Sequence, residues 1–258
     1  NPLNWSDNNV PGLDDDVTIE MMAYVVMMNA NGLAKSLTLE GLDTLKIKDG
    51  VHLDVDGDII INGNLMMEGI ASLSVEENWH RTGAFLPTNS AVYFDGNKDS
   101  DIETDETFYN VVLDKGPGKR LINRGVTNTR ITVQNNLEII AGEFQVRDLA
   151  GIDLDVNGTL YIDGSNVEGL DISNVVVDGI RVAIGGDFLN LSTDQRSFDP
   201  GTVSEMIFDG TGTQNLSTAV SDNGEIFANI SVQKPSGILL NMNSNIQIEG
   251  DLDIQGGT

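Results

Sequence analysis

The sequence predicts an all-β protein, an elongated β-solenoid similar to a parallel β-helix, built of irregular repeats and without significant helix. Three observations predict this fold: a short strand–bend–strand phrase that recurs, a longer repeat that encloses it, and a composition rich in glycine and poor in aromatic residues. We expect one continuous solenoid over residues 1–258, with repeat units at about 1–77, 78–187 and 188–258.

The short phrase is the end of one strand, a tight bend of Gly, Asn or Asp, and a second strand with apolar residues at alternate positions. Clear copies are VDGDIIING at 55–63, VNGTLYIDG at 156–164 and IEGDLDIQG at 248–256, with looser copies at 133–139 and 184–191. A unit repeated in this way indicates coils that stack on one another.

The longer repeat joins segments 92–96, 108–113 and 133–139, which are echoed at 206–210, 227–232 and 248–254. The offsets are 208 − 94 = 114, 227 − 108 = 119 and 248 − 133 = 115, so the register changes only by small insertions. Such insertions belong in loops between strands, where added length has a low free-energy cost.

The composition favours a narrow core. The chain has 40% hydrophobic residues, 5% aromatic residues and 28 glycines, which suits ladders of Val, Ile and Leu. With roughly 20 to 25 residues per coil and a spacing of about 4.8 Å, we expect a rod about 50 Å long.

Predicted strands follow one another from the start of the chain, at 17–19, 37–39, 44–47 and 51–55. In the last of these, Val51, Leu53 and Val55 share one face, whereas His52 and Asp54 share the other. The acidic residues should therefore form the outward half of a half-buried strand.

The longest apolar run, at 21–28, is followed by Asn and Gly residues, and we expect it to form one or two buried strands. It is shorter than the roughly 20 apolar residues that a membrane span needs, so we expect no membrane insertion.

The net charge of −26 argues against nucleic acid or an anionic membrane surface as a partner. Two interpretations of the acidity remain: solvation of an extracellular surface, or binding of divalent cations. The absence of cysteine excludes disulfides, thiolate nucleophiles and Cys-ligated zinc. Neither terminus reads as a cap, and no signal peptide is present, so we expect a fragment of a longer chain.

Some of these strings resemble a known family. Residues 4–6, 10–11 and 15–19 resemble the entry segment of repetitive surface proteins of Bacteroidota, and residues 208–216 and 227–232 resemble their internal repeats. Those proteins are very long, are commonly exported by the type IX secretion system, and are tethered outside the cell as adhesins, including gliding-motility adhesins. The resemblance covers nearly all of the chain and carries no catalytic residue.

The resemblance implies an extracellular, structural and adhesive segment of a cell-surface filament, made of stacked β-coils. Its expected partners are neighbouring repeats of the same chain, with other surface proteins and surface glycans as further options. A carbohydrate-binding module is the first alternative, and a polysaccharide lyase or hydrolase of the β-helix type is a more remote one.

Two acidic runs are candidate surface calcium sites, because calcium prefers several carboxylate and carbonyl oxygens. The alternative is that these carboxylates are only solvated. No cofactor is required, and Ca²⁺ is the one candidate ion. Residues 153–158 match the first half of an EF-hand loop, but Gly164 stands where the bidentate Glu belongs. The candidate ligands are Asp14, Asp15, Asp16, Asp99, Asp101, Glu103 and Asp105.

Trp5 and Trp79 each follow an Asn in a turn-rich segment. An exposed Trp in such a place could stack on a sugar ring. The alternative is that each ring is buried at the junction between repeat units, with its N–H bonded to a loop carbonyl.

Catalytic motifs are absent, so we expect no enzyme activity. The enzyme alternative rests on Lys46 and Lys48. They lie near His52, Asp54 and Asp56 in the sequence, and these residues could form an acid/base site on adjacent coils. Lysines beside outward acids more often form weak surface ion pairs.

Overall fold

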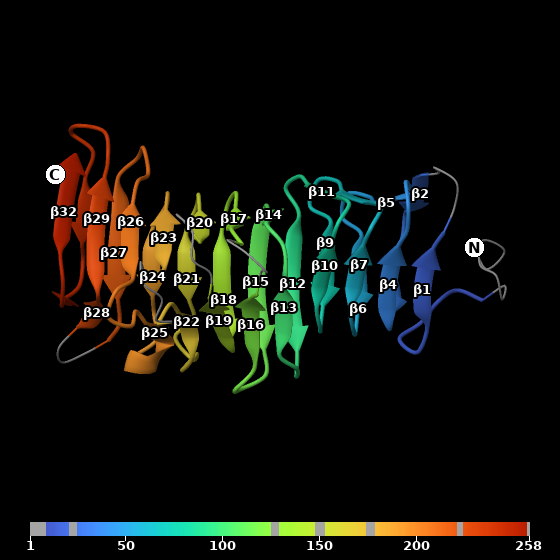
Figure 1. Cartoon of the computed structure of the whole chain (residues 1–258), viewed down its shortest axis with the longest axis horizontal. Coiled ribbons are helices and arrows are strands. Elements are labelled where there is room, and N and C mark those ends of the chain that lie inside the picture. The colour runs from blue at the N-terminus through green and yellow to red at the C-terminus, as the bar shows by residue number, and fades with distance from the viewer. Residues whose placement is uncertain are drawn as a thin grey trace.

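The computed structural model describes residues 9–20, 25–124, 129–147, 153–173, 179–220 and 224–256. Its strands pair in parallel and stack into an elongated rod, with β1 (Asp16–Ile19) near one end and β32 (Leu252–Gly256) at the other (Figure 1). The prediction of an all-β solenoid is confirmed.

Three strands make one coil, so each strand stacks on the strand three places earlier and the rod has three faces. Face A holds β1, β4 (Ser36–Leu39), β7 (Ile59–Ile61), β10 (Trp79–Arg81), β13 (Ser100–Ile102), β16 (Arg120–Asn123), β19 (Glu143–Val146), β22 (Gly169–Asp171) and β25 (Phe198–Asp199), followed by the separate pair β28 (Glu225–Phe227) and β31 (Ile246–Ile248).

Face B also consists of two sheets. The first is β2 (Val25–Met28), β5 (Thr44–Ile47), β8 (Asn64–Met67) and β11 (Ala84–Pro87), and the second is β14 (Glu106–Phe108), β17 (Ile131–Val133), β20 (Leu154–Val156), β23 (Arg181–Ile184), β26 (Glu205–Phe208), β29 (Asn229–Gln233) and β32. These two sheets meet where β11 contacts β14.

Face C is one ten-stranded sheet that runs the length of the rod. It consists of β3 (Gly32–Ala34), β6 (His52–Val55), β9 (Ser72–Val75), β12 (Ala91–Gly96), β15 (Asn110–Lys115), β18 (Leu137–Ala141), β21 (Leu160–Ile162), β24 (Phe188–Asn190), β27 (Gln214–Thr218) and β30 (Leu240–Met242).

The core is a set of apolar ladders, because alternate residues of each strand point inward and the parallel register stacks like on like. Leu53 of β6 aligns with Leu73 of β9, and Val55 aligns with Val75; all four are buried. The predicted inward face of 51–55 is therefore confirmed, with His52 and Asp54 on the outer side.

Glycine is required where the corners of successive coils touch. A Cβ on Gly57 would lie 2.6 Å from the carbonyl oxygen of Lys35 in the preceding coil, and one on Gly158 would lie 2.4 Å from the carbonyl oxygen of Asn135. These contacts explain why the bend of the short phrase carries glycine in copy after copy.

The longer repeat of the sequence is also a repeat of the structure. Equivalent strands of the second copy lie one face further round the rod than those of the first copy. The ten residues 106–115 correspond to 225–234 with a constant offset of 119, sharing Glu, Phe, Asn and Lys at equal positions. In the first copy they form β14 and β15, on faces B and C; in the second they form β28 and β29, on faces A and B.

The shared Lys of each copy is buried and closes a corner. The Nζ atom of Lys115 donates to the carbonyl oxygens of Glu76 (2.8 Å) and Asp95 (2.6 Å). Lys234 donates in the same way to Gly210 (3.0 Å) and Gly212 (2.9 Å). Burial lowers the pKa of Lys115 to about 8, against the opposing effect of nearby carboxylates.

The apolar run at 21–28 differs from its prediction. Only β2 lies within the described residues, and its Val25 and Met27 are 59% and 58% exposed. The run was expected to form one or two buried strands, but β2 is only half-buried and its alternate side chains face solvent. In the described part of the chain the helical structure is the short 3₁₀ turn η2 (Gln195–Ser197), and no helix there is long and apolar enough to cross a membrane.

Replacing Phe108 by Ala should lower the free energy of unfolding by about 3 to 5 kcal/mol, because a fully buried ring would leave a cavity in the core. Urea denaturation followed by circular dichroism would measure this. Leu86→Ala is the control, since that side chain is half exposed and its loss should cost less than about 1 kcal/mol. Equal losses in the two variants would contradict the assigned core.

Candidate functional site

An open acidic groove of about 590 Å³ crosses face A near the C-terminal end of the rod. It lies where that face is interrupted, between β25 of the nine-stranded sheet and the separate strand β28. One arginine, Arg196, lines it. The carboxylates of the lining are Glu143, Glu168, Asp171, Asp199, Glu225 and Glu249.

The interruption follows from local sequence. Residues added before β25 form the turn η2, whose N-cap Asp194 accepts a hydrogen bond from the Arg196 N–H at 2.9 Å. Pro200 follows β25 and has no N–H for the ladder, so the strand ends after two residues. Phe198 and Phe227 nevertheless stay in ring contact, with centroids 5.2 Å apart, which places β28 directly after β25 on face A.

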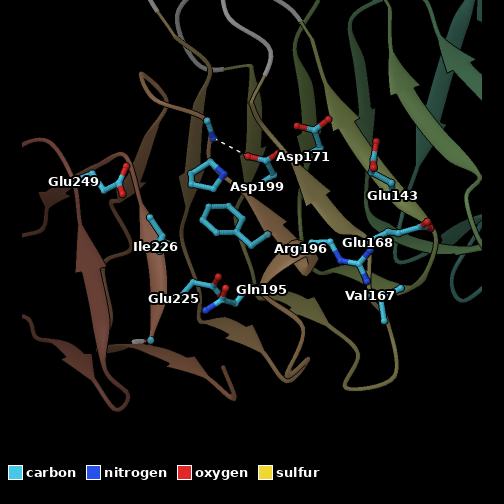
Figure 2. A pocket seen from close by; sticks show the side chains of 14 residues that line it. Glu143, Val167, Glu168, Asp171, Gln195, Arg196, Asp199, Glu225, Ile226 and Glu249 are labelled. Atoms are coloured by element: carbon cyan, nitrogen blue, oxygen red, sulfur yellow. Dashed lines mark hydrogen bonds between the residues drawn. The ribbon is translucent and has the colours of Figure 1, made fainter. Parts of the chain in front are cut away.

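Two carboxylates of the rim, Asp171 and Asp199, are held by local hydrogen bonds. Asp171 accepts from the Ser173 N–H at 2.8 Å, and Asp199 accepts from the Gly201 N–H at 3.0 Å. Figure 2 shows Glu143, Asp171 and Asp199 along one side of the groove and Glu249 at its far end. These contacts keep the acidic groups in place without neutralising them.

Glu225 differs from the rest because it is 2% exposed. Its Oε2 accepts from the Asn190 Nδ2 at 2.6 Å and from the Thr218 Oγ1 at 3.1 Å, both neutral donors. Burial raises the pKa of Glu225 to about 7, and those hydrogen bonds offset only part of the effect.

Acidic side chains outnumber basic ones in the lining of the groove. The pKa of Glu143 is raised first by burial and then by the nearby carboxylates of Asp171 and Glu168, although Arg120 opposes the change. Arg196 is already bound to Asp194, with the Nη2 to Oδ2 distance at 2.8 Å. Such a groove can accept hydrogen bonds from hydroxyl, ammonium or guanidinium groups.

No family model, curated protein sequence or solved structure matches this chain. The candidate site therefore rests on its own geometry.

The first predicted calcium run is at the start of β1. Asp15 accepts from the Gly12 N–H at 2.9 Å, and Asp14 is exposed. The Oδ atoms of Asp16 accept from Ser36 Oγ (2.7 Å) and Lys35 Nζ (2.9 Å), two contacts that lower the pKa of Asp16.

The second predicted run begins at Asp99, directly before β13, and continues through β13 into the loop that follows it. Its carboxylates contact four different groups: Asp99 the Arg120 N–H (3.1 Å), Asp101 the Arg124 Nη1 (3.2 Å), Glu103 the His80 Nδ1 (3.0 Å) and Asp105 the Arg130 N–H (2.8 Å). Among the described residues no three His, Asp or Glu side chains are grouped for a metal ion. Calcium binding by these runs stays a prediction.

The structure bears on one of the two tryptophans that were considered for glycan contact. Trp79 is fully buried, so its ring is not available for stacking on a sugar at the surface. Its indole N–H donates to the buried Glu106 carboxylate at 2.7 Å, where the sequence suggested a loop carbonyl. Trp5 lies outside the described residues.

The structure does not assemble the acid/base site considered at Lys46, Lys48, Asp54 and Asp56. Lys46 and Lys48 each lie 2.5 Å from a Glu68 oxygen at face B, whereas Asp54 is on the outer side of face C. Residues close in sequence are separated here because the chain turns a corner between β5 and β6.

The groove is the part of the site that sequence reasoning missed. Its residues come from successive coils, and Glu143 and Glu225 are 82 positions apart (225 − 143). One pattern could have indicated Glu225: a Glu begins both copies of the ten-residue repeat, at 106 and 225, two positions before a Phe in each.

Replacing Glu225 by Gln should flatten the pH dependence of stability. In the folded protein the pKa of Glu225 is about 7, against 4.5 for an ordinary Glu, so its stabilising contribution is complete below about pH 4.5 and is lost as pH rises through 7. Urea denaturation at a series of pH values would show the wild type losing stability relative to the variant over this interval. Glu138→Gln, on the outer side of face C, is the matched control and should not reproduce the difference.

Thermal unfolding with millimolar calcium, with magnesium, or with EDTA tests the acidic runs. If they bind calcium, the midpoint should rise with calcium alone, because a ligand that binds only the folded state stabilises it. Asp101→Asn with Asp105→Asn should remove that rise. Equal midpoints in all three conditions would leave these residues as solvating charge.

Proposed function

We propose that the chain is a structural and adhesive segment of a long extracellular filament, such as the stalk of a cell-surface adhesin. The observation that supports this is the unbroken stack of parallel strands along face C, with an apolar interior that follows it from coil to coil. In this proposal the chain acts through length, stiffness and surface display, and catalyses no reaction.

The surface chemistry supports the same proposal. Exposed strand edges tend to pair with other chains, and the large negative charge opposes such side-by-side association. At the last coil, Leu252 and Ile254 align with the buried residues Ile230 and Val232 of the preceding strand on this face, but they remain 47% and 58% exposed. A neighbouring repeat, stacked as a further coil, is the partner that would cover them.

A carbohydrate-binding module is the second candidate. Tyr93 and Tyr161 both face outward on face C and belong to one in-register row, in which Val112 and Glu138 lie between them. Three strand spacings of about 4.8 Å separate the two rings by about 14 Å. Partly exposed aromatic rings along one flat face are suited to stacking on sugars.

An antibody against residues 9–256 should label intact, non-permeabilised cells that make the protein, because the proposal places the chain outside the cell. Flow cytometry with and without permeabilisation would measure this, with an antibody to a cytosolic protein as the control. Labelling that requires permeabilisation would refute an extracellular location and, with it, the filament proposal.

A further inference from the structure

An aromatic triad lies in the first part of each of the repeat units 78–187 and 188–258. In the first, the ring centroids of Trp79, Phe85 and Phe108 lie 5.0 to 5.8 Å apart. In the second, the rings of Phe188, Phe198 and Phe227 lie 5.2 to 5.8 Å apart. The first triad comes from β10, β11 and β14, and the second from β24, β25 and β28, so each member is displaced by fourteen strands.

This correspondence pairs Glu106 with Glu225 and Arg81 with Asn190, since each pair occupies equal positions in strands fourteen apart. The two buried carboxylates can therefore be compared within one molecule.

In the first copy the buried carboxylate has a cationic partner. The Arg81 Nε lies 2.6 Å from the Glu106 Oε2, and the guanidinium also donates to the carbonyl oxygens of Gly83 and Asp105. The Trp79 N–H donates to the same Oε2 atom. A charged carboxylate removed from water is stabilised in this way by a cation and by hydrogen bonds.

In the second copy, none of the described residues places a cationic group against the Glu225 carboxylate. Asn190 donates to the Glu225 Oε2 at 2.6 Å, as Arg81 does to Glu106, but it carries no charge. Phe188 replaces Trp79 and has no N–H to donate. The nearest basic side chain of the groove, Arg196, is 77% exposed and is bound to Asp194.

The groove lies at this place and is lined by Glu225 together with five further carboxylates. Face A is interrupted here, just as face B is interrupted beside Glu106, where Arg81 contacts the carboxylate. We propose that the groove binds a cationic group of a ligand, a guanidinium or an ammonium, against Glu225 in the position that the Arg81 guanidinium has in the first copy.

The dimensions and lining narrow the class of ligand. A volume of about 590 Å³ exceeds a single guanidinium and accommodates an Arg or Lys side chain with its neighbours, or a polyamine. Val167 and Ile226 offer apolar contact to the methylene stem of such a group, and the rim carboxylates accept its N–H donors. This inference does not depend on the filament function, because any extracellular or other partner could supply the cation.

Titration of the full, ¹⁵N-labelled chain by NMR tests the proposal. The probe is N-acetyl-arginine amide, and the matched control probe is N-acetyl-citrulline amide, which has the same shape but no charge. We expect arginine to shift the amides of Gly201, Gly224 and Ile226, and citrulline to leave them unchanged. Spermidine, as a second probe, separates a free polyamine from a peptide side chain. Equal shifts with citrulline, or shifts spread evenly over the acidic rod, would overturn the proposal.

Variants locate the binding. Glu225→Gln keeps one acceptor oxygen, which can serve both Asn190 and Thr218, but removes the charge. It should raise the Kd for arginine amide about tenfold, the equivalent of about 1.4 kcal/mol. Glu138→Gln, outside the groove, should leave the Kd unchanged. An unaltered Kd in the Glu225 variant would overturn the proposal.

Asn190→Arg provides a test in the opposite direction and decides the matter if Glu225→Gln does not fold. It restores the pairing of the first copy, so the internal guanidinium should abolish binding of arginine amide and raise the thermal midpoint. Binding that persists in a folded Asn190→Arg protein would show that the ligand does not occupy this position.

Discussion

Parallel stacking of one coil on the next is the constraint on which the rest of the structure depends. Each strand must place its hydrogen-bonding groups about 4.8 Å from the strand before it, so every coil inherits the register of its neighbour. Inward positions are then apolar in coil after coil, and corners are closed by glycine where carbonyl groups approach closely. Extra residues can be added only at corners, as they are between β24 and β25, where they form η2 and shorten the next strand.

Local pattern was sufficient for the fold class but not for its cross-section. Alternation in segments such as 51–55 predicts strands and their inner face, because a half-buried strand has a period of two. The number of strands per coil was not predictable, because the recurring phrase indicates one corner of the coil and gives no information on the position or number of the other corners. The groove was missed for a related reason: Glu143, Asp171 and Asp199 become neighbours only through stacking. Burial of Glu225 and Lys115 was missed because charged residues are usually assumed to be exposed.

The buried polar groups show how a repeated backbone accommodates different chemistry. Lys115 and Lys234 occupy equivalent corners, and both donate to carbonyl oxygens. At this position the two copies therefore satisfy the buried ammonium group in the same way. The carboxylates of Glu106 and Glu225 are satisfied differently: Glu106 forms an ion pair, whereas Glu225 accepts from neutral amide and hydroxyl donors. The same residue type begins the equivalent strand in both copies, whereas the partner of its carboxylate depends on the side chain that the neighbouring strand provides. A repeat can thus conserve its architecture and still acquire a distinct chemical site in a single copy.

The fourteen-strand displacement between copies has a geometric consequence for any longer array of them. Fourteen is not a multiple of three, so each successive copy starts one face further round the axis, and a given side chain returns to its original direction only after three copies. At about 4.8 Å per coil, the fourteen coils of three copies amount to about 67 Å along the axis. Sites carried by the repeat would then follow a helical path around the filament axis. A flat surface touching one side of the filament would meet every third copy, while a partner in solution could approach from all directions.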